Sequence, residues 1–306
     1  MKLFLLKIIK FFLIIVVCYL VLFKLSNYLF VTKYSSVFPA FIIDKYNKVK
    51  IKGNEKRLLI IGGSNTIFSI DSELLEKKIG IPVVNLGMVF NTGYEFQQNF
   101  IKKYSQNGDI VLYIPEFENY RGEGKYGANV INTALIFKPQ LIELFGFKNR
   151  INFLKEGFKP LMLPILKYLQ ADSISSTFNR SHFNSYGDFT YVLHKKSKIK
   201  DTPASSYLKN MFLSDTFKND LNHFYESLES KGVKLFITFP VYSKNFIDKK
   251  VMKYADSLVQ NNPIFIGNLK ENLFEEKLFY DNFYHSLTKA RTIYTINLTT
   301  YLKDAI

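Results

Sequence analysis

The chain has 306 residues, 47% of them apolar, and carries a formal net charge of +15. This length and composition allow one sizeable core, or one core with a small subdomain, and exclude a disordered protein. The single cysteine, Cys18, excludes an intramolecular disulfide framework and a zinc site built from several cysteines. The lysines are spread along the chain without a compact basic block, so the charge does not predict nucleic-acid binding.

Residues 1–31 predict a single-pass transmembrane signal-anchor. The run 11–23 carries no charge, but as a helix it spans only about 20 Å, and a bilayer core needs about 30 Å. Because lysine side chains near the ends can reach the interface, the effective span extends from about Leu5 to Tyr28. Lysines ahead of the run favour a cytoplasmic N-terminus and therefore an extracytoplasmic location for the rest of the chain. A cleaved signal peptide is the alternative, but no A-x-A cleavage site follows the run.

A polar and aromatic connector occupies residues 32–56, and strands then alternate with helices. Strand–helix alternation predicts an α/β domain over 57–306, with a parallel sheet covered by helices. Residues 121–206 interrupt the alternation, and we interpret them as a mainly helical insertion with helix-like pieces at about 129–146 and 158–170. The predicted strands are 57–61, 81–87, 109–114, 233–239 and 263–267. The predicted helices are about 70–79, 94–104, 215–231, 247–260 and 288–303, and Gly80 is expected to end the first of them.

Two motifs follow the first two predicted strands, where parallel sheets bind ligands. The first is Gly62-Gly63-Ser64-Asn65. Its glycines allow a tight turn, and its serine presents a hydroxyl at the start of a helix, where a developing oxyanion is stabilised. A helix-capping serine is the simpler interpretation. The second is Asn85-Leu86-Gly87, which closes the second strand. Gly87 allows the backbone to approach a carbonyl closely and donate its amide, although a plain turn also explains it.

The third motif is 280–285, which contains Asp281 and His285. A nucleophilic serine needs a base, and the imidazole needs a carboxylate to fix its tautomer. The three other histidines are dispersed over the polar insertion and a predicted helix, and none forms an H-E-x-x-H motif. The sequence therefore predicts no metal site and no cofactor.

Together these motifs resemble the SGNH (GDSL-like) hydrolase superfamily in the order Ser64, Asp281, His285. The resemblance covers about 57–120 and 232–303 and is nearest to the membrane-anchored envelope branch, which includes the D-alanyl-transfer protein of teichoic acid synthesis and the alginate O-acetylation proteins. It implies a flavodoxin-like three-layer parallel sheet. It also implies an oxyanion hole from Ser64, Asn65, Gly87 and a polar residue after the third strand.

The chain departs from the family pattern in several places, among them Ala290, which stands where glycine is common, and 286–288, where Ser-Leu-Thr replaces the usual Leu-Asn. Three residues instead of two separate Asp281 from His285. After the third strand, Glu118 stands at the position of the family's asparagine, with Asn119 beside it. A carboxylate donates to an oxyanion only when it is protonated. The donor is therefore Asn119, or the hole consists of backbone amides alone, and Glu116 and Glu118 become candidates for binding a substrate hydroxyl.

The resemblance implies an extracytoplasmic serine esterase or O-acyltransferase that acts on acyl esters of a cell-envelope glycan. A membrane-bound O-acyltransferase is a candidate partner, and no sequence feature separates hydrolysis from transfer. Two alternatives remain open. One is a catalytically inactive SGNH-like accessory protein that binds a glycan or a membrane acyltransferase. The other is a phosphate- or nucleotide-binding flavodoxin-like domain that uses residues 62–65, although this leaves the Asp281–His285 pair unexplained.

Overall fold

The computed structural model describes residues 2–33, 35–36, 38–51, 55–127, 135, 137–146, 150, 178–199 and 207–306. Two compact units divide the chain. The first contains Met1–Ile43 and Asn132–Arg180, and the second contains Asp44–Ile131 and Ser181–Ile306. The predicted helix at 158–170 and residues 129–134 and 136 of the one at 129–146 lie outside the described residues. Within 129–146, Pro139–Leu144 forms a 3-10 helix.

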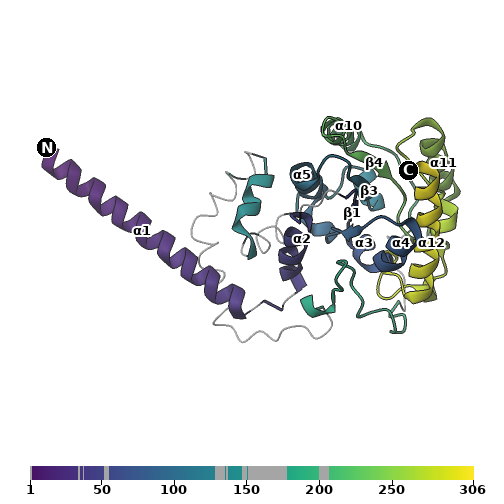
Figure 1. The fold of residues 1–306 in the computed structure, drawn as a ribbon, viewed down its shortest axis with the longest axis horizontal. Coiled ribbons are helices and arrows are strands. Elements are labelled where there is room, and N and C mark those ends of the chain that lie inside the picture. The colour runs from purple at the N-terminus through teal and green to yellow at the C-terminus, as the bar shows by residue number, and fades with distance from the viewer. Residues whose placement is uncertain are drawn as a thin grey trace. The chain divides into compact units, whose positions relative to one another are not determined.

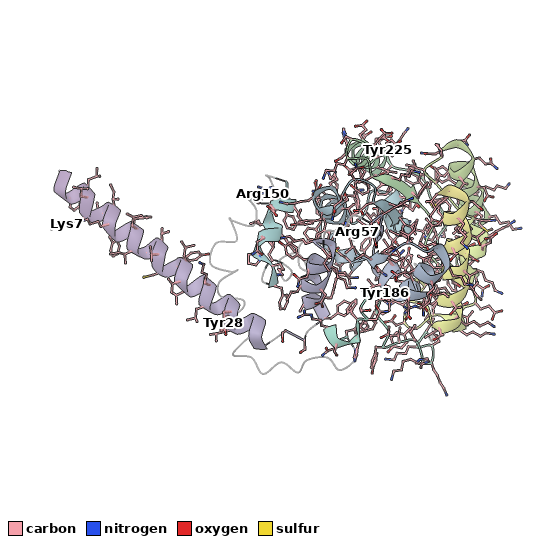
Figure 2. All side chains as sticks on the ribbon, viewed as in Figure 1. Lys7, Tyr28, Arg57, Arg150, Tyr186 and Tyr225 are labelled. Carbon is pink, nitrogen blue, oxygen red and sulfur yellow. The ribbon has the colours of Figure 1, made fainter. Side chains whose placement is uncertain are left out.

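A single long helix, α1 (Lys2–Lys33), forms the N-terminal part of the first unit. The 19-residue stretch Phe4–Leu22 is long and apolar enough to cross a membrane, and signal sequences meet the same criterion. Its apolar side chains are exposed around the helix (Figure 2). A soluble helix would bury such a surface, so α1 is a candidate membrane anchor or signal sequence.

The second unit is built on a four-stranded parallel sheet (Figure 1). Every residue of β1 and of β3 is buried, as the continuous apolar runs predict. The strand order β2-β1-β3-β4 is consistent with a flavodoxin-like fold, in which ligands bind where the order reverses, between β1 and β3. The strands are β1 (Leu58–Gly62), β2 (Val83–Asn85), β3 (Ile110–Ile114) and β4 (Lys234–Ile237).

Helices cover both faces of this sheet. The chain moves from β1 outward to β2 and then crosses back past β1 to β3, and right-handed crossovers in opposite directions place their helices on opposite faces. Figure 1 shows α5 and α10 on one face and α3, α4 and α12 on the other. The helices are α2 (Phe41–Val49), α3 (Ser64–Ser69), α4 (Ser72–Ile79), α5 (Tyr94–Tyr104), α6 (Phe117–Tyr120), α10 (Asp215–Glu229), α11 (Lys249–Asn261) and α12 (Thr288–Ala305).

A buried ion pair joins the starts of the two central strands. Arg57 precedes β1 and donates from Nε and Nη2 to the two carboxylate oxygens of Asp109, at 3.0 and 2.7 Å. Asp109 precedes β3 and is 2% exposed. The planar guanidinium matches the carboxylate in this two-bond arrangement, so the pair helps to fix the register of β1 against β3.

The structure differs from the sequence prediction in several elements. Helix α2 lies inside the segment described as a connector. One helix was expected before Gly80, but the chain forms α3 and α4, because Asp71 begins a new helix by accepting a hydrogen bond from the amide of Leu74. Residues 263–267 form only a bridge between Ile237 and Phe265. The two-residue strands β5 (Tyr242–Ser243) and β6 (Leu273–Phe274) were not predicted.

Candidate active site

Ser64 is the first residue of α3 and directly follows the turn that ends β1. Between Arg57 and Ile70 it is the one residue that is not buried. The two glycines before it allow the end of β3 to approach closely. A Cβ on Gly62 would lie 2.3 Å from the Ile114 carbonyl oxygen, and one on Gly63 would lie 2.2 Å from Glu116. The Gly-Gly-Ser motif therefore presents a serine at the β1/β3 edge of the sheet.

The predicted base and its carboxylate are in contact. The Nδ1 atom of His285 lies 2.6 Å from Asp281 Oδ1, and the His285 side chain is 10% exposed. The Asn282 side-chain nitrogen lies 3.0 and 3.2 Å from the two ring nitrogens. An atom nearly equidistant from both lies over the ring and makes poor hydrogen bonds with either. Phe68 stacks on the imidazole, with ring centroids 3.8 Å apart.

Helix α3 holds this histidine segment. The Ser69 hydroxyl donates to the Tyr284 carbonyl at 2.8 Å and accepts from the Ser286 amide at 3.2 Å. These bonds lie on either side of His285 in the sequence, and Phe68 contacts its ring. Phe68 is four residues after Ser64, so the two lie on one face of α3, separated by about 6 Å of helix rise. The same short helix therefore positions the serine and the histidine.

The Ser64 hydroxyl is hydrogen-bonded to Glu116 and not to His285. It donates to Glu116 Oε1 at 3.1 Å, and the Asn65 amide donates to the same oxygen at 3.3 Å. Burial, together with the charge of Glu118, raises the pKa of Glu116 to about 7, although hydrogen bonds from Asn65 and Ser64 act to lower it. Sequence reasoning named Glu116 only as a candidate for binding substrate, because its contact with Ser64 joins residues 52 positions apart.

Glu118 is bonded to the histidine segment through Tyr284. The Tyr284 hydroxyl donates to Glu118 Oε2 at 2.8 Å and accepts from the Phe117 amide at 3.1 Å. Burial raises the pKa of Tyr284 well above its ordinary value, and the charge of Glu118 acts in the same direction. A neutral phenol thus bridges α6 and the segment that carries His285. In this structure Glu118 positions that segment.

Two of the four residues expected in an oxyanion hole are bonded elsewhere. The Gly87 amide donates to Asn85 Oδ1 at 2.9 Å, and a Cβ on Gly87 would overlap the Thr66 hydroxyl. The turn interpretation therefore accounts for Gly87. Asn119 accepts from the Glu116 amide at 2.9 Å and donates to the Glu123 carbonyl at 3.2 Å, which closes the turn around α6. Of the four expected oxyanion-hole residues, Ser64 and Asn65 therefore remain as candidates, through their backbone amides at the start of α3.

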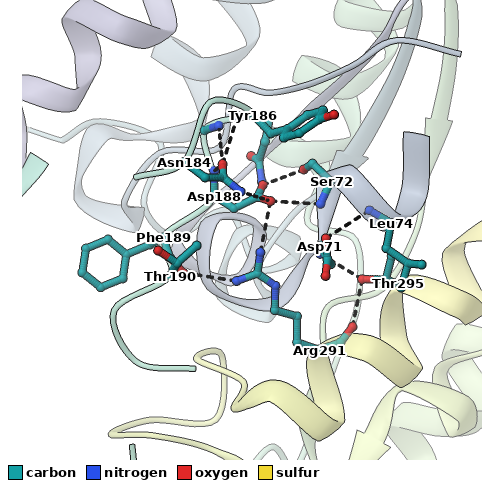
Figure 3. Close-up of polar contacts among 12 residues, drawn as sticks. Asp71, Ser72, Leu74, Asn184, Tyr186, Asp188, Phe189, Thr190, Arg291 and Thr295 are labelled. Atoms are coloured by element: carbon teal, nitrogen blue, oxygen red, sulfur yellow. Dashed lines mark hydrogen bonds and ion pairs between the residues drawn. The ribbon is translucent and has the colours of Figure 1, made fainter. Parts of the chain in front are cut away.

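A second buried polar cluster surrounds Asp188 and was not predicted (Figure 3). Arg291 of α12 donates to Asp188 Oδ2 at 3.1 Å, and both side chains are almost fully buried. Residues 181–199 belong to the segment described as an insertion, yet this cluster joins them to α4, β2 and α12. The remaining donors to the Asp188 carboxylate are the Ser72 amide and hydroxyl and the side chains of Asn85 and Asn184.

Within the described ranges no group of three or more His, Cys, Asp or Glu side chains could hold a metal ion. Comparison with protein-family models, with curated proteins and with solved structures returned no match for this chain.

Proposed function

We propose that this chain is a serine esterase or O-acyltransferase of the SGNH type. One observation carries the proposal: α3 begins with an accessible serine and also holds a histidine that is paired with a carboxylate. Nucleophile, base and orienting group are the three parts that acyl transfer through serine requires. Their position at the β1/β3 edge is where ligands bind in sheets of this strand order.

In the proposed reaction, Ser64 Oγ attacks an ester carbonyl carbon while its proton passes to His285 Nε2. The carbonyl electron pair moves onto oxygen, next to the Asn65 amide, and Asp281 stabilises the charged imidazole. The carbon–oxygen bond to the leaving alcohol then breaks, and His285 returns the proton to that alcohol. Water or a glycan hydroxyl removes the acyl group from Ser64 by the reverse sequence. Water as acceptor gives an esterase, and a glycan hydroxyl gives an O-acyltransferase.

This mechanism requires the Ser64 hydroxyl to turn from Glu116 to His285. Rotation about χ1 moves a serine hydroxyl between staggered positions without a change in the backbone. Catalytic hydrogen bonds also commonly tighten only once substrate is bound. The contact with Glu116 is therefore a resting arrangement in this proposal.

The membrane location completes the proposal. Helix α1 serves as a retained anchor, with its lysine-rich end in the cytoplasm and the α/β unit outside. An anchored site faces envelope polymers, and a positively charged chain suits anionic ones. A membrane-bound O-acyltransferase would then be a natural donor of acyl groups.

The second candidate is a non-catalytic accessory protein that binds a glycan or a membrane acyltransferase. The bond between Ser64 and Glu116 favours it, because a hydroxyl held by a carboxyl is not poised against His285. The same carboxyl argues against the phosphate-binding alternative, since Glu116 Oε1 already accepts from the Asn65 amide, which a phosphate at the start of α3 would need.

Labelling with a fluorophosphonate separates the first two candidates. The full-length protein in detergent is expected to react with the probe at Ser64, because an activated serine attacks the phosphorus atom. Peptide mass spectrometry locates the label. Ser64→Ala is expected to abolish labelling, whereas Ser230→Ala, which removes an exposed hydroxyl at the end of α10, should leave it intact. A folded wild-type protein that takes up no label would favour the accessory role.

A further inference from the structure

The oxyanion site of the proposed reaction lacks a side-chain donor among the residues first expected to supply one. Gly87 and Asn119 use their donors within their own turns. Asn65 directs its side-chain nitrogen to the Ile114 carbonyl at 3.1 Å and is 2% exposed. The donors that remain next to the Ser64 hydroxyl for an oxyanion are therefore backbone amides. Enzymes of this kind lose about 10²–10³ in rate when one oxyanion donor is removed, so a further donor has a large effect.

Glu116 occupies the position that such a donor requires. Its Oε1 atom touches both the Ser64 hydroxyl and the Asn65 amide, so the carboxyl lies between the nucleophile and the amide that faces the oxyanion. The residue is 3% exposed and follows β3, the strand next to β1. Gly63 leaves the space that the carboxyl fills, since a Cβ there would lie 2.2 Å from Oε1.

We propose that Glu116 is a catalytic residue that acts as the neutral acid and donates a hydrogen bond to the oxyanion formed when Ser64 is acylated. This inference rests on the proposed function. The proton stays on Glu116 throughout, because the Ser64 proton moves to His285 and then to the leaving alcohol. In the resting site Oε1 accepts from Ser64 and Asn65. Once substrate is bound, the protonated oxygen of the same carboxyl faces the oxyanion.

The surroundings of Glu116 favour its neutral form. On α6 the nearest charge is Glu118, and a second carboxylate disfavours ionisation. From the histidine segment, Tyr284 faces both carboxyls as an uncharged phenol. From α3 come the Ser64 hydroxyl and the backbone amides of Ser64 and Asn65, which are dipoles that stabilise the ionised form in part. An ionised Glu116 would also repel the developing oxyanion, which a neutral acid stabilises.

This role fixes the direction of a pH effect. Burial raises the pKa of Glu116 to about 7, so the neutral form dominates below that pH and is lost above it. The acylation rate should therefore fall roughly tenfold per pH unit above about 7. If Glu116 instead removed the Ser64 proton, it would need to be ionised, and the rate would rise over the same range.

Glutamine tests the role directly, because it keeps the shape and a neutral donor but cannot ionise. Full-length wild type, Glu116→Gln, Glu116→Ala and Ser64→Ala are compared in p-nitrophenyl acetate hydrolysis from pH 5 to 9, with melting temperatures as a check on folding. The nitrophenolate leaving group needs no proton, so an alkaline decline cannot come from leaving-group chemistry. Glu116→Gln should lose less than about tenfold in rate and should lack the alkaline decline. Glu116→Ala should lose at least about 100-fold.

Other outcomes overturn the role. A Glu116→Gln protein that melts like wild type but is as inactive as Ser64→Ala would make Glu116 an ionised base. A Glu116→Ala protein with the wild-type rate, or a wild-type rate that rises above pH 7, would remove Glu116 from the oxyanion site. In each of these outcomes the wild type still hydrolyses the ester through Ser64, so the proposed function stands. If the wild type shows no Ser64-dependent hydrolysis, both the proposed function and the role of Glu116 are wrong.

Discussion

Replacing His285 by alanine is expected to lower the rate of Ser64 acylation by roughly 10⁴–10⁶-fold, with little change in substrate binding. The imidazole is the one described base that is paired with a carboxylate and held by α3. Without the imidazole, the proton that leaves Ser64 during acylation has no neutral acceptor. Asp281→Asn should cost roughly 10⁴-fold, because the asparagine amide favours the wrong imidazole tautomer. Stopped-flow measurement of p-nitrophenolate release in the full-length protein gives both rates.

His223→Ala is the matched control for this prediction. The His223 side chain is 80% exposed on α10, and its Nδ1 atom lies 3.6 Å from Glu226 Oε2. Its loss should change the acylation rate by less than about twofold, since surface substitutions away from a site have small effects. Equal rates for the His285→Ala and His223→Ala proteins would show that the paired histidine takes no part in catalysis.

Replacing Asp188 by alanine is expected to cost about 3–5 kcal/mol of unfolding free energy. The substitution leaves the buried guanidinium of Arg291 without its counter-charge, and it orphans the donors from Ser72, Asn85 and Asn184. Burial lowers the pKa of Arg291, and the charge of Asp188 acts in the opposite direction. Urea unfolding followed by tyrosine fluorescence measures the loss, because the chain has 20 tyrosines and no tryptophan.

Asp304→Ala provides the comparison, because this aspartate is exposed near the end of α12. The expected change is within about 0.5 kcal/mol. If Asp188→Ala destabilised the protein by no more than Asp304→Ala, the cluster in Figure 3 would not stabilise the packing of residues 181–199 against α4, β2 and α12.

The sequence predicted the parallel sheet because its two central strands are unambiguous. The runs that became β1 and β3 are continuous and apolar, which is the pattern of strands buried on both faces. Helix α5 matches its predicted bounds, and Gly80 ends α4 in the left-handed conformation that glycine favours. The short strands β5 and β6 have two residues each, too few for any periodicity to reveal them.

The site was predictable only where its parts are local. Asp281 and His285 lie four positions apart in the sequence, and the position of Ser64 follows from the strand before it. The contact of Glu116 with Ser64 instead depends on how β1 and β3 lie side by side, which no local pattern encodes. The same is true of Asp188, whose partners come from three separate elements. The Gly87 prediction relied on family position, and the structure bonds that amide to Asn85.

The most direct test of the central claim is whether an acyl group from an ester substrate becomes attached to Ser64. The full-length protein is mixed with p-nitrophenyl acetate, quenched with acid within the first turnover and digested for peptide mass spectrometry. We expect an acetyl group on the peptide that contains Ser64, and no adduct in the Ser64→Ala protein. Ester hydrolysis by the wild type that proceeds without an adduct on Ser64, or that persists in Ser64→Ala, would contradict an acyl-serine mechanism.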